Sequence, residues 1–110
     1  NSEQAAFVCS LCAHLAYNVS TASIVAMTKS AAKEFATDGI LLGAIARGSI
    51  DTPRTDSFDT EQKEVFRRAA LLQRHVTARE LADAVWYLVS GRSTFFTGAT
   101  LQVNGGSLRV

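Results

Sequence analysis

The sequence predicts an α/β fold in which helices cover a parallel β-sheet. Three observations favour this class. Short apolar runs without polar alternation are typical of strands buried on both faces, and segments with apolar residues at three- or four-residue steps lie between them. The elements follow in the order strand, helix, strand, loop, two helices, strand. With 110 residues, 47% of them hydrophobic, the chain is one globular domain or part of a larger one.

The first half of the chain supplies two strands and a long helix. Residues 5–11, "AAFVCSL", form an apolar run that we expect to be a buried strand. Residues 18–38 follow a helical pattern, and Gly39 comes directly after it, as expected past a helix C-terminus. Residues 40–46, "ILLGAIA", are the second strand candidate. The pattern predicts a strand, a long helix and a return strand.

The second half supplies two capped helices and a last strand. The polar segment "RGSIDTPRTDSFD" is long enough to be a functional loop. Asp59 and Gln62 predict a helix start, and that helix is expected to run through "KEVFRRAALLQ". Thr77 and Glu80 form a second capping-box pattern, which opens "LADAVWYLVS" and ends at Gly91. "ATLQV" is the last strand, followed by two glycines.

Three strands make a small sheet whose first strand would have an unpaired edge. Parallel strands are normally flanked by other strands and covered on both faces. The chain also starts with Asn1 rather than methionine. We therefore expect a truncated or processed chain whose missing part lies on the N-terminal side.

Composition excludes several classes of function. The net charge of +1 and the lack of a basic stripe argue against a nucleic-acid partner. The apolar runs are far shorter than the roughly 20 residues that span a bilayer, so we expect no membrane association. Two cysteines do not make a disulfide scaffold. We therefore expect a cytoplasmic protein.

Three separated blocks resemble one family in the same order and register: "YNVSTASIVAMTKSAAKEFATDGILLGAIARGSIDTP", "ARELADAVWYLVSG" and "FFTGATLQVNGG". They resemble the C-terminal half of the short-chain dehydrogenase/reductases, over about residues 7–106. The resemblance implies half of a Rossmann-type, doubly wound parallel sheet, with residues 1–110 as a single partial domain. It also implies NAD or NADP as cofactor, a small carbonyl or alcohol as substrate, and a homo- or hetero-oligomer.

The resemblance assigns Tyr17 as the catalytic acid or base and as a cofactor contact. A free tyrosine has a pKa of about 10, so a reactive phenol needs a neighbour that stabilises its anion. In the family a lysine one helical turn later does this, but here that position is Thr21, which offers a hydroxyl without charge. Lys29 lies too far along the helix to replace it. The alternative role of Tyr17 is to pack as an amphipathic residue at a helix end.

The family's second catalytic residue is a serine that polarises the substrate carbonyl. Ser10 in "VCSLC" is the nearest match, although the segment between it and Tyr17 is shorter than in the family. The alternative is a hydroxyl that bonds the local backbone at a strand end. Ser10 is thus a catalytic candidate, provided that the short segment lets it reach the same face as Tyr17.

The nicotinamide-side contacts are expected after the second strand. By resemblance Gly48, Ile50 and Thr52 match family positions that line the nicotinamide through backbone and hydroxyl groups. Gly43 replaces a family asparagine of the proton relay, and Arg47 replaces a proline. Arg47 is either a phosphate ligand or, more commonly for such a residue, a solvated loop arginine.

The glycine-rich turn that binds a dinucleotide pyrophosphate is not found among the seven glycines. We therefore expect that the chain alone does not hold NAD(P) well. The expected function is that of an NAD(P)-dependent oxidoreductase, present as a truncated and weakly active or inactive half, in the extreme a pseudoenzyme. The alternative is a non-catalytic subunit or scaffold that assembles with a complete homologue.

Other chemical patterns are weaker. Cys9 and Cys12 form a C-x-x-C motif with His14 nearby, which is compatible with a thiol redox pair. The alternative is that both are buried cysteines of a strand, where positions three apart face opposite sides and have no redox role. A zinc site would need a second pair of ligands, so we expect no metal. Arg74 is expected to bond backbone before the last helix, and His75 to reach solvent.

Overall fold

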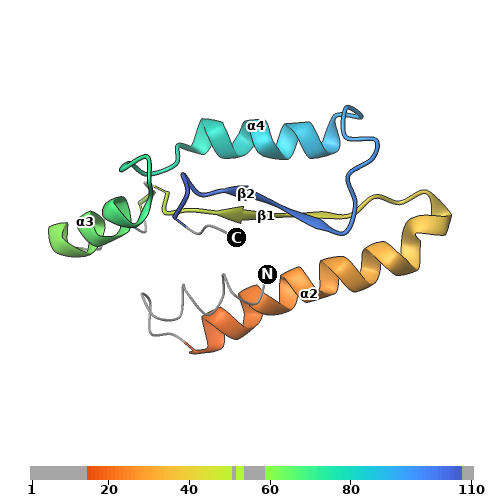
Figure 1. Ribbon diagram of the computed structural model, residues 1–110, viewed down its shortest axis with the longest axis horizontal. Coiled ribbons are helices and arrows are strands. Elements are labelled where there is room, and N and C mark those ends of the chain that lie inside the picture. The colour runs from red at the N-terminus through yellow and green to blue at the C-terminus, as the bar shows by residue number, and fades with distance from the viewer. Residues whose placement is uncertain (1–14, 51, 54–58, 108–110) are drawn as a thin grey trace. The chain divides into compact units, whose positions relative to one another are not determined.

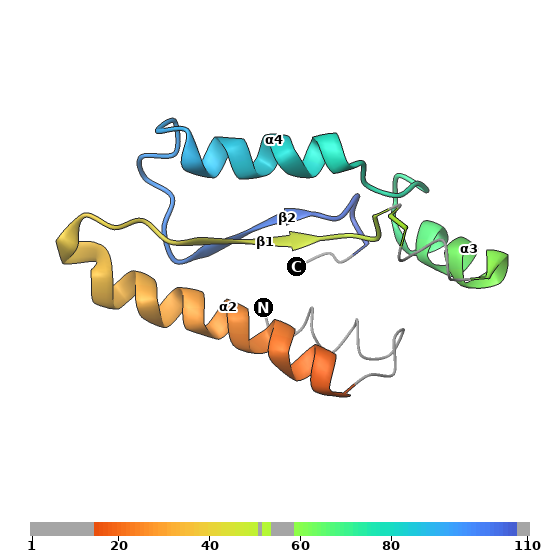
Figure 2. The same ribbon diagram turned by 180° about the vertical axis from the view of Figure 1, so that it is seen from behind.

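The computed structural model describes residues 15–50, 52–53 and 59–107 of the chain. Its elements, in chain order, are α2 (Leu15–Phe35), the 3-10 helix η1 (Ala36–Asp38), β1 (Gly43–Arg47), α3 (Thr60–Ala69), α4 (Ala78–Val89) and β2 (Ala99–Val103) (Figure 1). The two strands are hydrogen-bonded neighbours in a parallel sheet, and they run side by side in Figures 1 and 2. The predicted α/β class is confirmed, and the arrangement is that of a partial Rossmann-type sheet.

The chain divides into two compact units. The first unit comprises Asn1–Ala44 and Gly91–Leu101, and the second comprises Ile45–Ser90 and Gln102–Val110. The boundary between the units therefore falls within both strands.

In the first unit, α2 is one unbroken helix that ends at Phe35, and η1 continues the helical segment to Asp38, directly before Gly39. Gly39 adopts a φ of 73°, and its N–H donates to the Ala36 carbonyl at 3.1 Å. Glycine adopts this left-handed conformation without a steric penalty, which explains why the helix stops there. The buried face of α2 consists of Val25, Thr28 and Ala32.

Small side chains let this face approach the segment before β2. A Cβ at Gly98 would lie 3.3 Å from the Ala32 Cβ, so the close approach depends on glycine. The Gly98 N–H donates to the Leu42 carbonyl at 2.7 Å. By contrast, Ile24 and Met27, two larger apolar residues of the same helix, are 53% and 64% exposed.

In the second unit, α3 begins at its predicted cap, because the Asp59 side chain accepts the Gln62 N–H at 2.7 Å. The prediction that α3 continues to Gln73 is wrong, since the helix ends at Ala69. Beyond it the chain turns back, and Gln73 has a left-handed φ of 52°.

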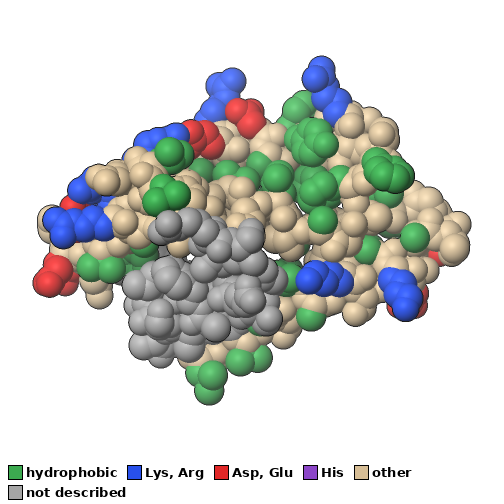
Figure 3. All heavy atoms as spheres, viewed as in Figure 1, with side chains coloured by type: hydrophobic (Ala, Val, Ile, Leu, Met, Phe, Trp, Pro, Cys, Tyr) green, Lys and Arg blue, Asp and Glu red, His purple; other side chains and the backbone are tan. Residues whose placement is uncertain are grey.

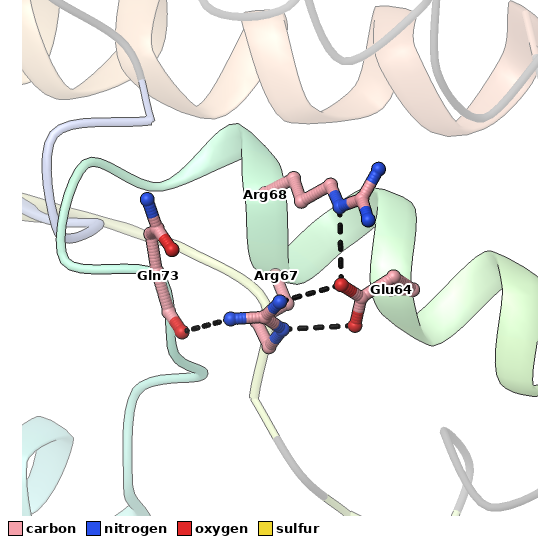
Figure 4. Close-up of polar contacts among 4 residues, drawn as sticks. All are labelled: Glu64, Arg67, Arg68 and Gln73. Atoms are coloured by element: carbon pink, nitrogen blue, oxygen red, sulfur yellow. Dashed lines mark hydrogen bonds and ion pairs between the residues drawn. The ribbon is translucent and has the colours of Figure 1, made fainter.

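An ion-pair cluster holds this turn against α3. Glu64 pairs with both Arg67 and Arg68, and Nη1 of Arg67 donates to the Gln73 carbonyl at 3.0 Å (Figure 4). These bonds lower the pKa of Glu64 to about 2, mainly through Arg67. The cluster therefore fixes residue 73 relative to the last turn of α3.

The capping box at the start of α4 is confirmed. The Thr77 hydroxyl accepts the Glu80 N–H at 3.1 Å, and the Glu80 carboxylate accepts the Thr77 N–H at 2.9 Å. The helix ends at Val89, and Gly91 follows with a φ of 77°. The capping box and the glycine after the helix are both local features of the sequence.

Many large apolar side chains lie at the surface of the described residues. In Figure 3 hydrophobic side chains are visible over the region of α4, and α4 contains no buried residue. Val85, Trp86 and Val89 are 48%, 66% and 68% exposed. The helix thus presents an apolar face that the described residues do not cover.

β1 begins at Gly43 rather than at Ile40 and includes Arg47, and the predicted first strand at 5–11 lies outside the described residues. Of the helices that the structure describes, none has the length and apolar character needed to cross a membrane.

Candidate functional site

The segment that follows β1 begins with a glycine that approaches the neighbouring strand closely. The Gly48 N–H donates to the Val103 carbonyl at 2.9 Å, which continues the sheet pairing past the end of β1. A Cβ at Gly48 would lie 3.0 Å from the Asn104 Cα and 3.3 Å from its carbonyl oxygen. Both are backbone atoms and cannot swing aside, so this position requires glycine.

The next two residues are held by the strand-like segment before α4. The Val76 N–H donates to the Ser49 carbonyl at 2.9 Å, and Ile50 forms a parallel bridge with Val76. The Ser49 hydroxyl lies 3.0 Å from Nδ1 of His75. His75, which was expected to reach solvent, is half-buried, and its imidazole is also bonded to the candidate segment.

An ion pair between Arg74 and Glu80 is hydrogen-bonded to the backbone of His75. The Arg74 guanidinium donates to both carboxylate oxygens of Glu80, at 3.0 and 2.6 Å, and to the His75 carbonyl at 3.2 Å. The backbone bond predicted for Arg74 is confirmed, but its main partner is Glu80. Hydrogen bonds from Arg74, followed by the Thr77 N–H, lower the pKa of the Glu80 carboxyl to about 2. The same pairing raises the pKa of Arg74.

The turn after β2 completes this part of the second unit. Asn104 is buried, and its side-chain oxygen accepts the Gly106 N–H at 3.0 Å. The Leu72 N–H donates to the Gly105 carbonyl at 3.2 Å. A cavity of about 290 Å³ lies between these groups, with Gly48 and Ser49, Arg74 and Glu80, and Asn104 in its lining. The carboxyl ends of both strands thus open onto one small polar and apolar space.

Arg47, the last residue of β1, is exposed, and one of its guanidinium nitrogens donates to the Gly48 carbonyl at 3.1 Å. This contact places its charge beside the candidate segment. Thr52 is half-buried and described, whereas residue 51 between Ile50 and Thr52 is not.

Tyr17 belongs to the first turn of α2, as predicted, and Thr21 follows in the same unbroken helix. Residues four apart on a helix are neighbours on one face, so position 21 is the place from which a side chain could act on Tyr17. Tyr17 lies in the first unit, whereas Gly48, Ile50 and Thr52 lie in the second. Their meeting in one site remains a prediction.

Ser10, Cys9 and Cys12 lie outside the described residues, so their predicted roles are not tested. Within the described part of the chain, no group of three histidine, cysteine or acidic residues is arranged to hold a metal ion.

Sequence reasoning missed four residues that shape this site: Ser49, His75, Glu80 as the partner of Arg74, and Asn104. Glu80 was recognisable as a cap, but nothing local indicates that its carboxylate also binds Arg74.

Known proteins match nearly all of this chain. A family model described as Enoyl-(Acyl carrier protein) reductase matches residues 4–107. The 3-oxoacyl-(acyl-carrier-protein) reductase FabG of Rickettsia bellii is 43% identical over 94 residues, covering 86% of this chain and 39% of the relative. Nodulation protein G of Rhizobium sp. (strain N33) is 39% identical over 90 residues, covering 82% of this chain and 37% of the relative.

A third relative, the FabG reductase of Staphylococcus aureus, is 37% identical over 90 residues and is matched over 37% of its length. The chain therefore spans less than two fifths of the length of these relatives. The match between the predicted motifs, the α/β elements and the family model leads to one conclusion. The chain belongs to the short-chain dehydrogenase/reductase family.

Proposed function

We propose that this chain is the C-terminal half, residues 1–110, of a single NAD(P)-dependent oxidoreductase domain. The reaction is hydride transfer between the cofactor and a carbonyl or alcohol, which family membership supports. The proposal includes a cytoplasmic location and a homo- or hetero-oligomeric enzyme.

The observation that carries the proposal is the held segment after β1. In open α/β sheets ligands bind outside the carboxyl ends of the strands. Gly48 bonds Val103 at that end of the sheet, and the next residues are bridged to Val76. Gly48, Ile50 and Thr52 would contact the nicotinamide through backbone groups and the threonine hydroxyl.

The described residues fit the nicotinamide end of the cofactor and not its pyrophosphate. A pyrophosphate needs glycines at a helix N-terminus, where backbone N–H groups approach the phosphates. Asp59 precedes α3 and Thr77 precedes α4, and both side chains already cap their helices. The chain by itself would therefore hold NAD(P) weakly.

When bound, the cofactor would supply the hydride for the carbonyl carbon in the proposed reduction. Tyr17 would give its phenolic proton to the carbonyl oxygen and regain one from solvent, so that the product is an alcohol, and Ser10 would donate a hydrogen bond to the same oxygen. Thr21 supplies no positive charge one turn along α2. Because a general acid works best when its pKa lies near the working pH, this substitution would make the reaction slow.

The names of the relatives suggest the substrate class to test first. Two of them are 3-oxoacyl-(acyl-carrier-protein) reductases. We propose that the substrate is likewise a ketone, with a 3-oxoacyl thioester as its first representative.

The proposed function can be tested in a joined chain, in which residues 1–110 follow the part of the Rickettsia bellii relative that this chain does not match. The joined chain is expected to bind NADH or NADPH and to oxidise it slowly with a 3-oxoacyl thioester. Tyr17→Phe should abolish turnover while cofactor binding persists. Full turnover of the Tyr17→Phe variant, or no dinucleotide binding by the joined chain, would contradict the proposal.

A second candidate function is favoured by the uncovered face of α4. A non-catalytic subunit would use Val85, Trp86 and Val89 to pair with a complete homologue. Co-purification with such a homologue should then be lost in Trp86→Glu and kept in Arg79→Glu, a charge change on the same helix. Equal pairing of both variants would count against this surface.

A further inference from the structure

The residues directly after β1 have few ways to keep their position. The sheet pairing of β1 continues only to the Gly48 N–H, which bonds the last residue of β2. Gly48 also has no side chain that could pack and fix the chain direction. Whatever fixes Ser49 and Ile50 must therefore come from outside the sheet.

That support comes from two consecutive residues before α4. The Val76 N–H holds the Ser49 carbonyl at 2.9 Å, and Nδ1 of His75 holds the Ser49 hydroxyl at 3.0 Å. One hydrogen bond alone would leave the segment free to rotate about it. Two bonds to the backbone and the side chain of the same residue fix both its position and its orientation.

The backbone of His75 is itself attached to a fixed point. The Arg74 guanidinium binds the His75 carbonyl at 3.2 Å and Glu80 through two further bonds. Glu80 is part of the capping box with Thr77, so this chain of contacts ends on the first turn of α4. The segment after β1 is thus tied to a helix terminus through His75.

We infer that His75 is a positioning residue, whose hydrogen bond to Ser49 sets the place of the Gly48–Ile50 segment against the nicotinamide. The inference rests on the proposed function for the identity of the ligand. The contact itself is independent of that function and can be measured without any cofactor.

Three variants separate the hydrogen bond from the bulk of the ring. His75→Phe keeps a planar ring without nitrogen, Ser49→Ala removes the hydroxyl, and His75→Asn retains a polar atom close to the position of Nδ1. Arg79→Ala serves as a matched control, since Arg79 is an exposed residue on α4, which follows His75 in the chain. Its Nε lies 3.9 Å from Oδ1 of Asp83. Thermal unfolding of each variant checks that the fold persists.

The first measurement is amide hydrogen exchange of Val76 in the 110-residue chain, because that N–H reports the bond to Ser49. We expect exchange about tenfold faster in His75→Phe and Ser49→Ala, a rate near that of the original chain in His75→Asn, and no change in Arg79→Ala. An unchanged rate in His75→Phe would overturn the inference.

The second measurement is binding by the joined chain of its preferred reduced dinucleotide and of the matching ADP-ribose, which lacks the nicotinamide. Loss of the His75 contact should weaken dinucleotide binding about tenfold and ADP-ribose binding less than twofold. Equal weakening of both ligands would indicate a general structural defect and overturn the positioning role. If the original joined chain binds no dinucleotide, the proposed function fails, whereas unchanged binding in His75→Phe refutes this inference alone.

Discussion

The segment after β1 and the first turns of α2 hold the residues predicted for the site, and they are built in different ways. The segment is held mainly through backbone groups, such as the Gly48 N–H and the Ser49 carbonyl. The α2 part depends on the side chains at positions 17 and 21 of an otherwise regular helix.

This difference shows how geometry and chemistry can change separately. Threonine at position 21 leaves α2 unbroken, and arginine at position 47 is accommodated as the last residue of β1. The backbone frame therefore tolerates substitutions that remove a charge or a rigid turn. A preserved frame is evidence for family membership, whereas activity depends on particular side chains.

The largest effect is expected from restoring a cation in α2. Thr21→Lys in the joined chain should raise kcat about 100-fold, because an ammonium one turn from Tyr17 favours the phenolate, and general acid–base catalysis contributes effects of this size. The pH–rate profile should shift to lower pH at the same time. Steady-state kinetics from pH 6 to 10 would measure both changes.

The matched control is Ser20→Lys, which adds the same charge one residue away and hence on another side of the helix. An equal gain in this control would mean that the added charge acts at a distance. No gain in Thr21→Lys would refute the idea that position 21 limits the reaction.

The next largest effect tests the backbone-held segment. Gly48→Ala should lower the free energy of unfolding by about 1–3 kcal/mol, because the new Cβ would press on the backbone of Asn104. Gly91→Ala meets no atom within 4 Å and is disfavoured only by its positive φ. It should cost about 1 kcal/mol. Urea unfolding compares the two, and a smaller cost at Gly48 would mean that β2 can yield at this point.

The features that could be predicted from sequence are those set by neighbouring residues. The caps at Asp59 and Thr77 and the glycine that follows η1 are set by local hydrogen bonding and backbone conformation, and all three are found in the structure. The end of α3 could not be predicted. "ALLQ" continues a helical pattern, but Leu72 bonds Gly105 and Gln73 bonds Arg67 instead of extending the helix.

Contacts between distant residues account for the rest. The bond between His75 and Ser49 joins two segments that share no local pattern. The buried face of α2 was also hidden, because Ala32 packs against Gly98 whereas the larger Ile24 and Met27 stay exposed. Hydrophobic periodicity predicts that a helix exists; which face is covered depends on its neighbours.

A smaller effect should appear in acid, since the carboxylates that support the second unit have lowered pKa values. Glu64 and Glu80 both titrate at about 2 in the folded chain, against 4.5 without their partners. A carboxylate whose pKa is lower in the folded state than in the unfolded state stabilises the fold at pH values above the unfolded pKa. This contribution is lost as the pH falls from 4.5 towards 2. The melting temperature of Glu80→Gln should therefore fall less over this range than that of the original chain.

Asp83→Asn provides the control for this pH dependence, because Asp83 lies 3.9 Å from Arg79 in a pair that is largely exposed. Its acid profile should match that of the original chain. Salt should weaken the effect of Glu80, whose side chain is 40% exposed. Parallel acid profiles of Glu80→Gln and the original chain would show that the Arg74 pair is not maintained in solution.

The smallest effect concerns the turn between α3 and His75. Gln73 has a φ of 52°, a conformation that costs a residue with a Cβ about 1 kcal/mol and costs glycine little. Gln73→Gly should therefore stabilise the chain by up to about 1 kcal/mol, reduced by the greater freedom of glycine in the unfolded state. The same change at the helical Gln62 should destabilise by about 1 kcal/mol. If both variants lost stability, the left-handed turn would not persist in solution, and the path from α3 to His75 would have to differ.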